Sequence, residues 1–168
     1  METIRFQGTK CHTIGFIPVV GSHLPTFELV DSDLNVVTYN DFKDLRLVLN
    51  IFPSLDTSVC AASVRRFNTE ATSLPNTKVL CVSMDLPFAA KRFCSTEGID
   101  NLTVASAFRS TAFAHDYGLR IVDGPLAGLL ARAVIIADES GKIIYRELVD
   151  EITHEPNYKA ALDALRGN

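Results

Sequence analysis

Cys60 is the residue of this sequence best placed to act as a nucleophile. The chain from Val48 to Phe67 reads as an apolar strand, a polar turn and a helix, and Cys60 falls in the first turn of that helix. Unpaired backbone N–H groups and the positive end of the helix dipole lie there, and both favour an anion. Because the thiolate is the reactive form of cysteine, the segment predicts a nucleophilic thiol.

Arg132 is the cation that we expect to assist Cys60. A helix dipole contributes up to about 2 kcal/mol to an anion in a partly buried site, whereas a majority of thiolate at neutral pH needs about 3 kcal/mol. Arg132 opens an apolar strand predicted over 131–137, where a permanent charge needs a partner or a route to water. A strand-end arginine that reaches solvent or pairs with an acid is the ordinary alternative, and the pattern leaves both open.

Cys60 also has a purely structural interpretation. On a helix that begins near Ser58 it shares one face with three apolar residues, Val64, Phe67 and Ala71. Cysteine often packs on such a face as a small hydrophobic residue. If the side chain points inward, its sulfur would lie at the bottom of a small pocket that admits only a slender substrate. The helical pattern alone leaves core packing and catalysis open.

A longer motif decides between these interpretations. Pro53, Thr57 and Cys60 form Pro-x-x-x-Thr-x-x-Cys, which resembles the motif of the peroxiredoxins, and with Arg132 they match four active-site positions of that family. The resemblance extends over essentially the whole chain and is closest to the bacterial thiol peroxidases, the atypical two-cysteine peroxiredoxins. The supporting segments are 50–54, 85–89, 92–94, 123–126 and 148–153.

The resemblance implies a role for each of these residues. Cys60 would be the peroxidatic cysteine, and Cys94 would resolve its oxidised form as an intramolecular Cys60–Cys94 disulfide. The Thr57 hydroxyl would donate to the thiolate or the peroxide, although a helix N-cap is its ordinary role. Pro53 would fix the turn and shield the nucleophile from water, although it could simply end the strand.

The same resemblance implies the reaction and the partners. Members of the family reduce hydrogen peroxide and organic hydroperoxides in antioxidant defence, are re-reduced by thioredoxin, and have a thioredoxin fold, usually as homodimers. A disulfide needs Cα atoms within roughly 7 Å of each other. We therefore predict that the first turn of the Cys60 helix and the segment around Cys94 unwind locally before they join.

Three other functions compete with this one. A peroxide-responsive redox sensor could use the same disulfide as a switch. A dithiol oxidoreductase is disfavoured because the chain contains no Cys-x-x-Cys. Cys60 and Arg66 have the spacing of cysteine phosphatases, but residues 61–65 favour a helix over a loop that wraps a phosphate. Cys81 reads as a core residue and Cys11 lies in an N-terminal turn region, so neither is assigned a role.

Composition restricts the class of protein without indicating the chemistry. The 168 residues are 47% hydrophobic and 21% charged, which suits a single domain over residues 1–168. A net charge of −4 does not support a nucleic-acid partner. Without an apolar N-terminal run or a membrane-spanning stretch, and with only four cysteines, we expect a cytoplasmic protein. The four histidines lack ligand spacing, so no metal or organic cofactor is expected.

The pattern of elements predicts an α/β protein with a thioredoxin-like fold, in which an N-terminal β extension precedes a mixed central sheet flanked by helices. The near-continuous apolar strands are typical of central strands covered on both faces. A turn at 138–141 predicts an antiparallel hairpin. The expected strands, after short strands and turns up to Asp33, are 45–52, 78–84, 102–106, 131–137 and 142–148, and the expected helices are 58–73, 86–95, 111–117 and 158–166.

Overall fold

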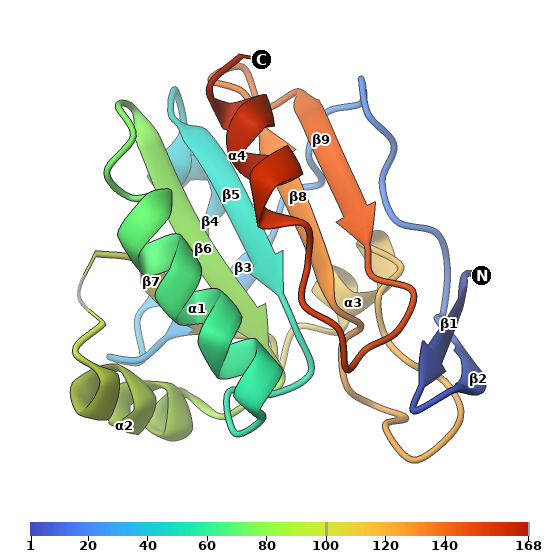
Figure 1. Cartoon of the computed structure of the whole chain (residues 1–168). Helices are drawn as coiled ribbons and strands as arrows, with labels where there is room; N and C mark the ends of the chain where they lie inside the picture. Colours follow the sequence, from blue (N-terminus) through green and yellow to red (C-terminus); the bar gives the residue numbers. More distant parts are fainter. Residues whose placement is uncertain (100, 168) are drawn as a thin grey trace.

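Seven strands form one mixed sheet in residues 1–99 and 101–167, the part of the chain that this computed structural model describes (Figure 1). Their order is β4-β3-β7-β6-β5-β8-β9, in which the β5–β6 and β6–β7 pairs are parallel and the other pairs antiparallel. The strands are β3 (Glu28–Asp31), β4 (Val36–Thr38), β5 (Arg46–Ile51), β6 (Thr77–Ser83), β7 (Thr103–Ser106), β8 (Ala133–Ala137) and β9 (Ile143–Leu148).

Helices cover both faces of this sheet. In Figure 1, α1 and α4 lie in front of the strands and α3 lies behind them. A second, two-stranded sheet of β1 (Thr3–Phe6) and β2 (Thr9–His12) stands beside the β9 end. The helices are η1 (Tyr39–Phe42), α1 (Ser58–Glu70), α2 (Pro87–Glu97), α3 (Thr111–Asp116) and α4 (Tyr158–Leu165).

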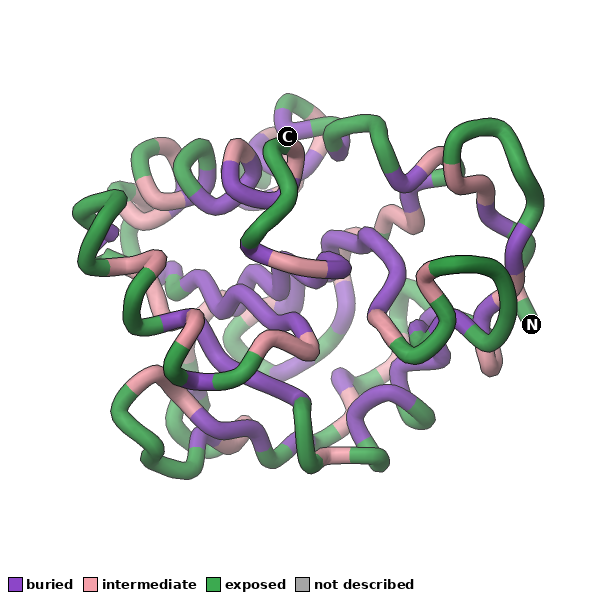
Figure 2. The backbone as a smooth tube through the Cα atoms, turned by 90° about the horizontal axis from the view of Figure 1, so that it is seen from below, coloured by how far each residue is buried: buried purple, intermediate pink, exposed green. Residues whose placement is uncertain are grey.

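The central strand β5 divides the core into two layers because its side chains point to alternate faces. Leu47, Leu49 and Ile51 pack on the side of α3, whereas Val48 and Asn50 face α1. Every residue of β5 except Arg46 is buried, as expected for a strand covered on both sides. Figure 2 shows buried positions through the middle of the molecule and exposed positions along the outer helices and loops.

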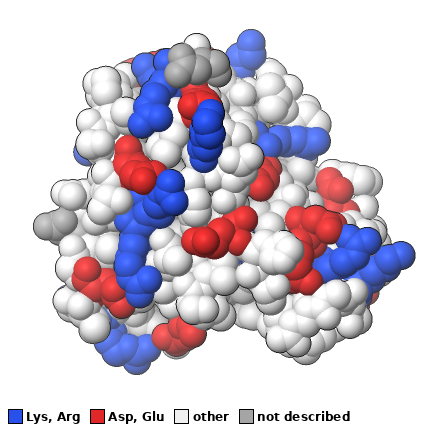
Figure 3. Space-filling model, in the orientation of Figure 1, with Lys and Arg blue, Asp and Glu red and all other residues white. Residues whose placement is uncertain are grey.

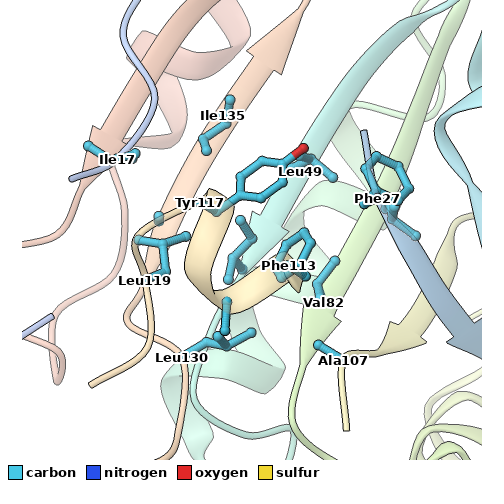
Figure 4. Close-up of a cluster of buried hydrophobic side chains, with 14 of the residues drawn as sticks. Ile17, Phe27, Leu49, Val82, Ala107, Phe113, Tyr117, Leu119, Leu130 and Ile135 are labelled. Atoms are coloured by element: carbon cyan, nitrogen blue, oxygen red, sulfur yellow. The ribbon is translucent and has the colours of Figure 1, made fainter. Parts of the chain in front are cut away.

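Aromatic side chains lie among aliphatic ones in the layer beneath α3 (Figure 4). Phe113 stacks on Tyr117 with ring centroids 4.4 Å apart, and it meets Phe27 edge to face at 6.4 Å. The Tyr117 hydroxyl donates to the Pro25 carbonyl at 2.6 Å, which satisfies the one polar atom of this buried side chain. The layer is therefore a packed core, and the opposite layer, beneath α1 and α4, holds Cys60.

The structure confirms the predicted α/β architecture and differs from the prediction at some boundaries. Gly98 ends α2 in a left-handed conformation with a φ of 67°, as expected of a C-terminal stop. The strand predicted from 131 begins at Ala133 instead, because the Ala131 N–H donates to Leu119 rather than to a sheet neighbour. Arg132 therefore precedes β8. The predicted short N-terminal strands are followed by β4 and η1, which the sequence analysis did not anticipate.

Charges of both signs alternate over the face seen in Figure 3. Several charged side chains form ion pairs at the surface, such as Arg65 with Glu97 at 2.8 Å and Lys159 with Asp163 at 2.7 Å. Exposed pairs of this kind contribute little to stability. Within residues 1–99 and 101–167, no helix combines the length and the apolar character needed to cross a membrane.

The β1–β2 hairpin is fastened to the segment after β9 by the carboxylate of Glu151. This carboxylate accepts hydrogen bonds from the Gly8 N–H at 2.8 Å and the Gln7 N–H at 3.2 Å. It also accepts from the Thr153 N–H at 3.1 Å. Led by the bond from Gly8, these contacts lower the pKa of Glu151 from its ordinary 4.5 to about 2.

Glu151→Gln is expected to lower stability at neutral pH but not at low pH. A carboxylate with a lowered pKa in the folded state adds stability above its unfolded pKa, and loses that contribution as the pH falls through its folded value. The gap in unfolding free energy between wild type and variant should therefore shrink between about pH 4.5 and pH 2. Urea unfolding across this range measures it, and a gap that stays constant would contradict the prediction.

Candidate active site

Cys60 occupies the third position of α1, where the sequence predicts it. Thr57 is the N-cap residue, and its carbonyl accepts the Ala61 N–H at 3.0 Å. The Cys60 side chain is 0% exposed and lies in the core layer that also holds Val64 and Phe67. It therefore points inward from the first turn, as the helical period predicts.

The Arg132 side chain contacts Cys60 although the two residues are 72 positions apart in the chain. Its Nη1 lies 3.2 Å from the Cys60 Sγ, and its Nε donates to the Ile152 carbonyl at 2.9 Å. The side chain is only 2% exposed, so it does not extend to solvent. A permanent cation is thus held in contact with a fully buried sulfur. In such a setting the attraction between a guanidinium and a thiolate is much less weakened by water than at the surface.

The position of Arg132 is set by the backbone around it. The Val149 N–H donates to its carbonyl at 3.0 Å, and Ile152, whose carbonyl fixes Nε, donates its own N–H to Arg5 of β1 at 2.9 Å. The hairpin that Glu151 fastens therefore also supports the segment that orients the guanidinium.

Thr57 and Pro53 lie in the loop between β5 and α1. Pro53 is buried, and Thr57 is exposed. The Thr57 hydroxyl donates to the Ser54 carbonyl at 3.0 Å and makes no helix-capping bond, so only its backbone has the ordinary N-cap role. The one proton of this hydroxyl is therefore directed at Ser54, so it does not donate toward Cys60 as predicted and can only accept a further hydrogen bond.

A pocket of about 310 Å³ lies between this loop and α2. Thr57 and Ser58 line it from the start of α1, and Arg92 and Phe93 line it from α2. The apolar residue Leu55 also lines the pocket. Thr57 therefore borders a space large enough for a small polar molecule with an apolar substituent. Cys60 and Arg132 are not among the residues that line it, so the small pocket predicted above the Cys60 sulfur is not formed by this space.

Cys94 lies on α2 and is half-buried. It packs against the same core layer as Cys60, and burial raises the pKa of its thiol. All four cysteines are free, so the chain is in its dithiol form. The structure thus places the two predicted redox thiols on neighbouring helices, α1 and α2, without a bond between them.

Cys81 and Cys11 have settings that favour inert thiols. Cys81 is 0% exposed in β6, and burial raises its pKa to about 12. Burial also raises the pKa of Cys11, and the neighbouring Asp123 adds to this rise. Both side chains remain protonated at neutral pH, and a buried thiol is a poor nucleophile.

A buried polar link beneath Cys60 was missing from the sequence analysis. The Ser63 hydroxyl donates to the Cys60 carbonyl at 2.8 Å, and Asn50 Nδ2 donates to Ser63 Oγ at 3.1 Å. Both residues are 0% exposed. The signal in the sequence is one amide within the apolar run 47–52, which required a partner on the facing helix.

Asp85 was also missed as a site residue. Its carboxylate accepts hydrogen bonds from the Ser54 hydroxyl at 2.8 Å, the Leu55 N–H at 2.7 Å and the Ser83 hydroxyl at 2.7 Å. It therefore holds the loop before α1 from a position just before α2. Nothing in its local sequence identifies these partners, because two of them are about thirty residues away in the chain.

The geometry disfavours phosphatase chemistry. Residues 61–65 are helical, and Arg66 points away from Cys60 to pair with Glu70 at 2.7 Å, with its guanidinium over the Tyr158 ring at 4.7 Å. Residues 1–99 and 101–167 contain no cluster of three or more histidine, cysteine or acidic side chains placed to hold a metal ion. The described site is a buried cysteine sulfur in contact with an arginine.

Comparisons with known proteins agree with this geometry. A family model described as Redoxin matches residues 19–162. The chain is 57% identical to a thiol peroxidase of Corynebacterium glutamicum over 165 residues, which cover 98% of this chain and 99% of that protein. It is 52% identical to a thiol peroxidase of Mycobacterium tuberculosis over 165 residues, with the same coverage of both chains.

Solved structures show the same fold. A crystal structure of a peroxiredoxin-like protein from Aquifex aeolicus matches with a TM-score of 0.93 and 41% identity, covering 98% of this chain and 96% of that one. A thiol peroxidase from Chromobacterium violaceum matches with a TM-score of 0.90 at 23% identity, covering 98% and 95% of the two chains. These matches confirm the predicted thioredoxin-like α/β fold.

Proposed function

Since this chain belongs to the Redoxin family, as a peroxiredoxin enzyme of the thiol peroxidase type, we propose that it reduces hydrogen peroxide and organic hydroperoxides at Cys60. The observation that carries this proposal is the 3.2 Å contact between the Arg132 guanidinium and the buried Cys60 sulfur. A fixed cation against a helix-start thiol favours the thiolate that a peroxidase needs.

In the first step the Cys60 thiolate attacks one oxygen of the peroxide. The S–O bond forms as the O–O bond breaks, so the sulfur loses two electrons and becomes a sulfenic acid. The other oxygen leaves with the electron pair and takes a proton from water, giving an alcohol or water. Arg132 and the N–H groups at the start of α1 stabilise the developing charge.

In the second step the Cys94 thiol attacks the oxidised sulfur. The S–S bond forms, the sulfenic oxygen departs with two protons as water, and Cys60 and Cys94 become an intramolecular disulfide. An external dithiol, for which we name thioredoxin, then supplies two electrons and two protons and restores both thiols. Since Cys60 is completely buried in the dithiol form, the first turn of α1 and the segment around Cys94 unwind before they join.

The assembly belongs to the same proposal. We expect one domain over residues 1–168 acting as a homodimer, as the family resemblance implies. Lys and Arg lie among Asp and Glu on the face seen in Figure 3, and this mixed distribution does not favour a nucleic-acid partner. The partners we propose are therefore the peroxide and a protein reductant. The cycle needs only the thiols of this chain and those of the reductant.

Peroxide consumption coupled to thioredoxin, its reductase and NADPH tests the cycle. Wild type should turn over continuously, whereas Cys94→Ser should consume about one equivalent of peroxide per chain and accumulate a Cys60 sulfenic acid, because the resolving thiol is missing. A sulfenic-acid-trapping diketone followed by mass spectrometry identifies the oxidised residue.

The controls separate the alternatives. Cys11→Ala removes a buried thiol on β2, in the other core layer, and should turn over like wild type. If Cys94→Ser turned over normally, the resolving assignment would be wrong. If wild type itself reacted only once, the chain would act as a peroxide sensor.

A further inference from the structure

The Asp85 carboxylate joins the starts of the two helices that carry the redox thiols. It lies two residues before Pro87, the first residue of α2, and it accepts the Ser54 hydroxyl and the Leu55 N–H from the loop before α1. The Ser83 hydroxyl at the end of β6 accepts the Asp85 N–H at 3.2 Å and donates to the carboxylate at 2.7 Å. The side chain is therefore fixed on the sheet before it reaches the loop.

The loop transmits this attachment to Thr57. Ser54, held by Asp85, accepts the Thr57 hydroxyl at 3.0 Å and the Thr57 N–H at 3.3 Å at its carbonyl. Its own hydroxyl oxygen accepts the Asp56 N–H at 3.1 Å. A carboxylate that accepts several hydrogen bonds at 2.7–2.8 Å forms strong, charge-assisted contacts. The N-cap of α1 is thus tied to α2 through two residues.

We propose that Asp85 is a positioning residue whose contacts to Ser54 and Leu55 hold the active-site loop for the oxidation of Cys60, and must break for Cys60 and Cys94 to join. This inference rests on the proposed two-cysteine cycle. We refer to the contacts of the Asp85 carboxylate with Ser54 and Leu55 as the Asp85 latch.

The latch acts on the two steps in opposite directions. With the latch made, the loop holds Thr57 and the first turn of α1 in place, which the attack on the peroxide requires. Unwinding of that turn removes the loop from the start of α2, so Ser54 and Leu55 must release the carboxylate. A weaker latch therefore slows oxidation and speeds disulfide formation. A variant that is merely less stable is not expected to show slower oxidation together with faster disulfide formation.

Asp85→Asn tests the latch with an isosteric change. The amide nitrogen donates where a carboxylate oxygen accepts, so either the donation from the Ser54 hydroxyl or those from the Leu55 N–H and the Ser83 hydroxyl can no longer be made. In a Cys94→Ser background, stopped-flow oxidation by hydrogen peroxide should slow about tenfold, the effect of a small misplacement of reacting groups. With Cys94 present, the rate of disulfide formation after one equivalent of peroxide should rise severalfold.

Two further variants link the effect to the latch. Ser54→Ala removes one latch contact, should shift both rates in the same directions, and should add little when combined with Asp85→Asn, because the two residues share one contact. Asp33→Asn removes a carboxylate that pairs with Lys91 of α2 at 3.3 Å, outside the loop. Both rates should stay at their wild-type values in that variant.

The outcomes are distinct. If the Asp85→Asn rates stayed within twofold of wild type, or if both fell together, the latch would be wrong while the peroxidase cycle stood. If the Cys94→Ser parent formed no Cys60 sulfenic acid, the proposed cycle and the latch would both be wrong. Opposite shifts of the two rates, shared by Ser54→Ala, would establish the latch.

Discussion

Cys60→Ser is expected to lower peroxide consumption to the rate seen without protein. A serine hydroxyl at this position is a far weaker nucleophile than a thiolate, and it has no sulfenic state through which the cycle could pass. The smaller side chain still fits the buried site beside Arg132, so the fold should persist. Initial rates in the thioredoxin-coupled assay, with unfolding curves of both proteins, measure the two effects separately.

The control for Cys60→Ser is the loss of a different buried thiol. Cys11→Ala should keep the wild-type rate, because Cys11 lies in β2 and packs in the layer beneath α3. Residual turnover by Cys60→Ser that disappears in a Cys60→Ser, Cys94→Ser double variant would move the peroxidatic role to Cys94 and contradict the assignment.

Arg132→Met should slow the oxidation of Cys60 by about a hundred- to a thousandfold, the usual effect of removing one preorganised charge-stabilising donor. The guanidinium has two tasks in this geometry: Nη1 contacts the sulfur, and Nε is fixed by the Ile152 carbonyl. Methionine fills a similar volume without charge, so the thiolate and the departing oxygen lose their cation while the core stays packed.

Stopped-flow oxidation of pre-reduced protein by hydrogen peroxide measures this loss. Arg132→Lys keeps a positive charge but loses the planar guanidinium that contacts both the Cys60 sulfur and the Ile152 carbonyl. Its oxidation rate should therefore lie between the rates of Arg132→Met and wild type. Arg120→Met removes one exposed arginine elsewhere and controls for net charge, with a rate near that of wild type. An Arg132→Met rate within threefold of wild type would show that the guanidinium is not needed.

Much of the architecture could be predicted from the sequence because each element carries its own signal. The period of α1 places Cys60 on the same face as Val64 and Phe67, and the structure buries all three. The Asp138–Gly141 turn was recognisable from its residue types, and Asp138 does accept the Ser140 and Lys142 N–H groups there. The residue types within α1 and within this turn were therefore sufficient to predict both.

The strand β4 carried no comparable signal. It has three residues at the edge of the sheet, and it follows Leu34, which takes a left-handed φ of 68° although it is not a glycine. A run this short cannot show an alternating pattern, and its pairing with β3 is what makes it a strand.

The site was only partly predictable for a related reason. The Pro-x-x-x-Thr-x-x-Cys motif and Arg132 could be found by resemblance, but the contacts of Asn50 and Asp85 depend on tertiary neighbours. Asn50 meets Ser63 from another element, and Asp85 meets Ser54 thirty-one residues away. A hydrogen bond between distant segments has no characteristic residue spacing by which its two partners could be recognised in the sequence.

The separation of Cys60 and Arg132 along the chain affects how the protein is made. The two residues are 72 positions apart, and they meet because β5 pairs with β8. Chains are synthesised from the N-terminus, and contacts between distant segments form late in folding. A ribosome-bound chain that ends before β8 therefore carries Cys60 without its guanidinium. The nucleophile acquires that charge only when synthesis is nearly complete, so truncated or half-folded chains would expose an ordinary thiol rather than an activated one.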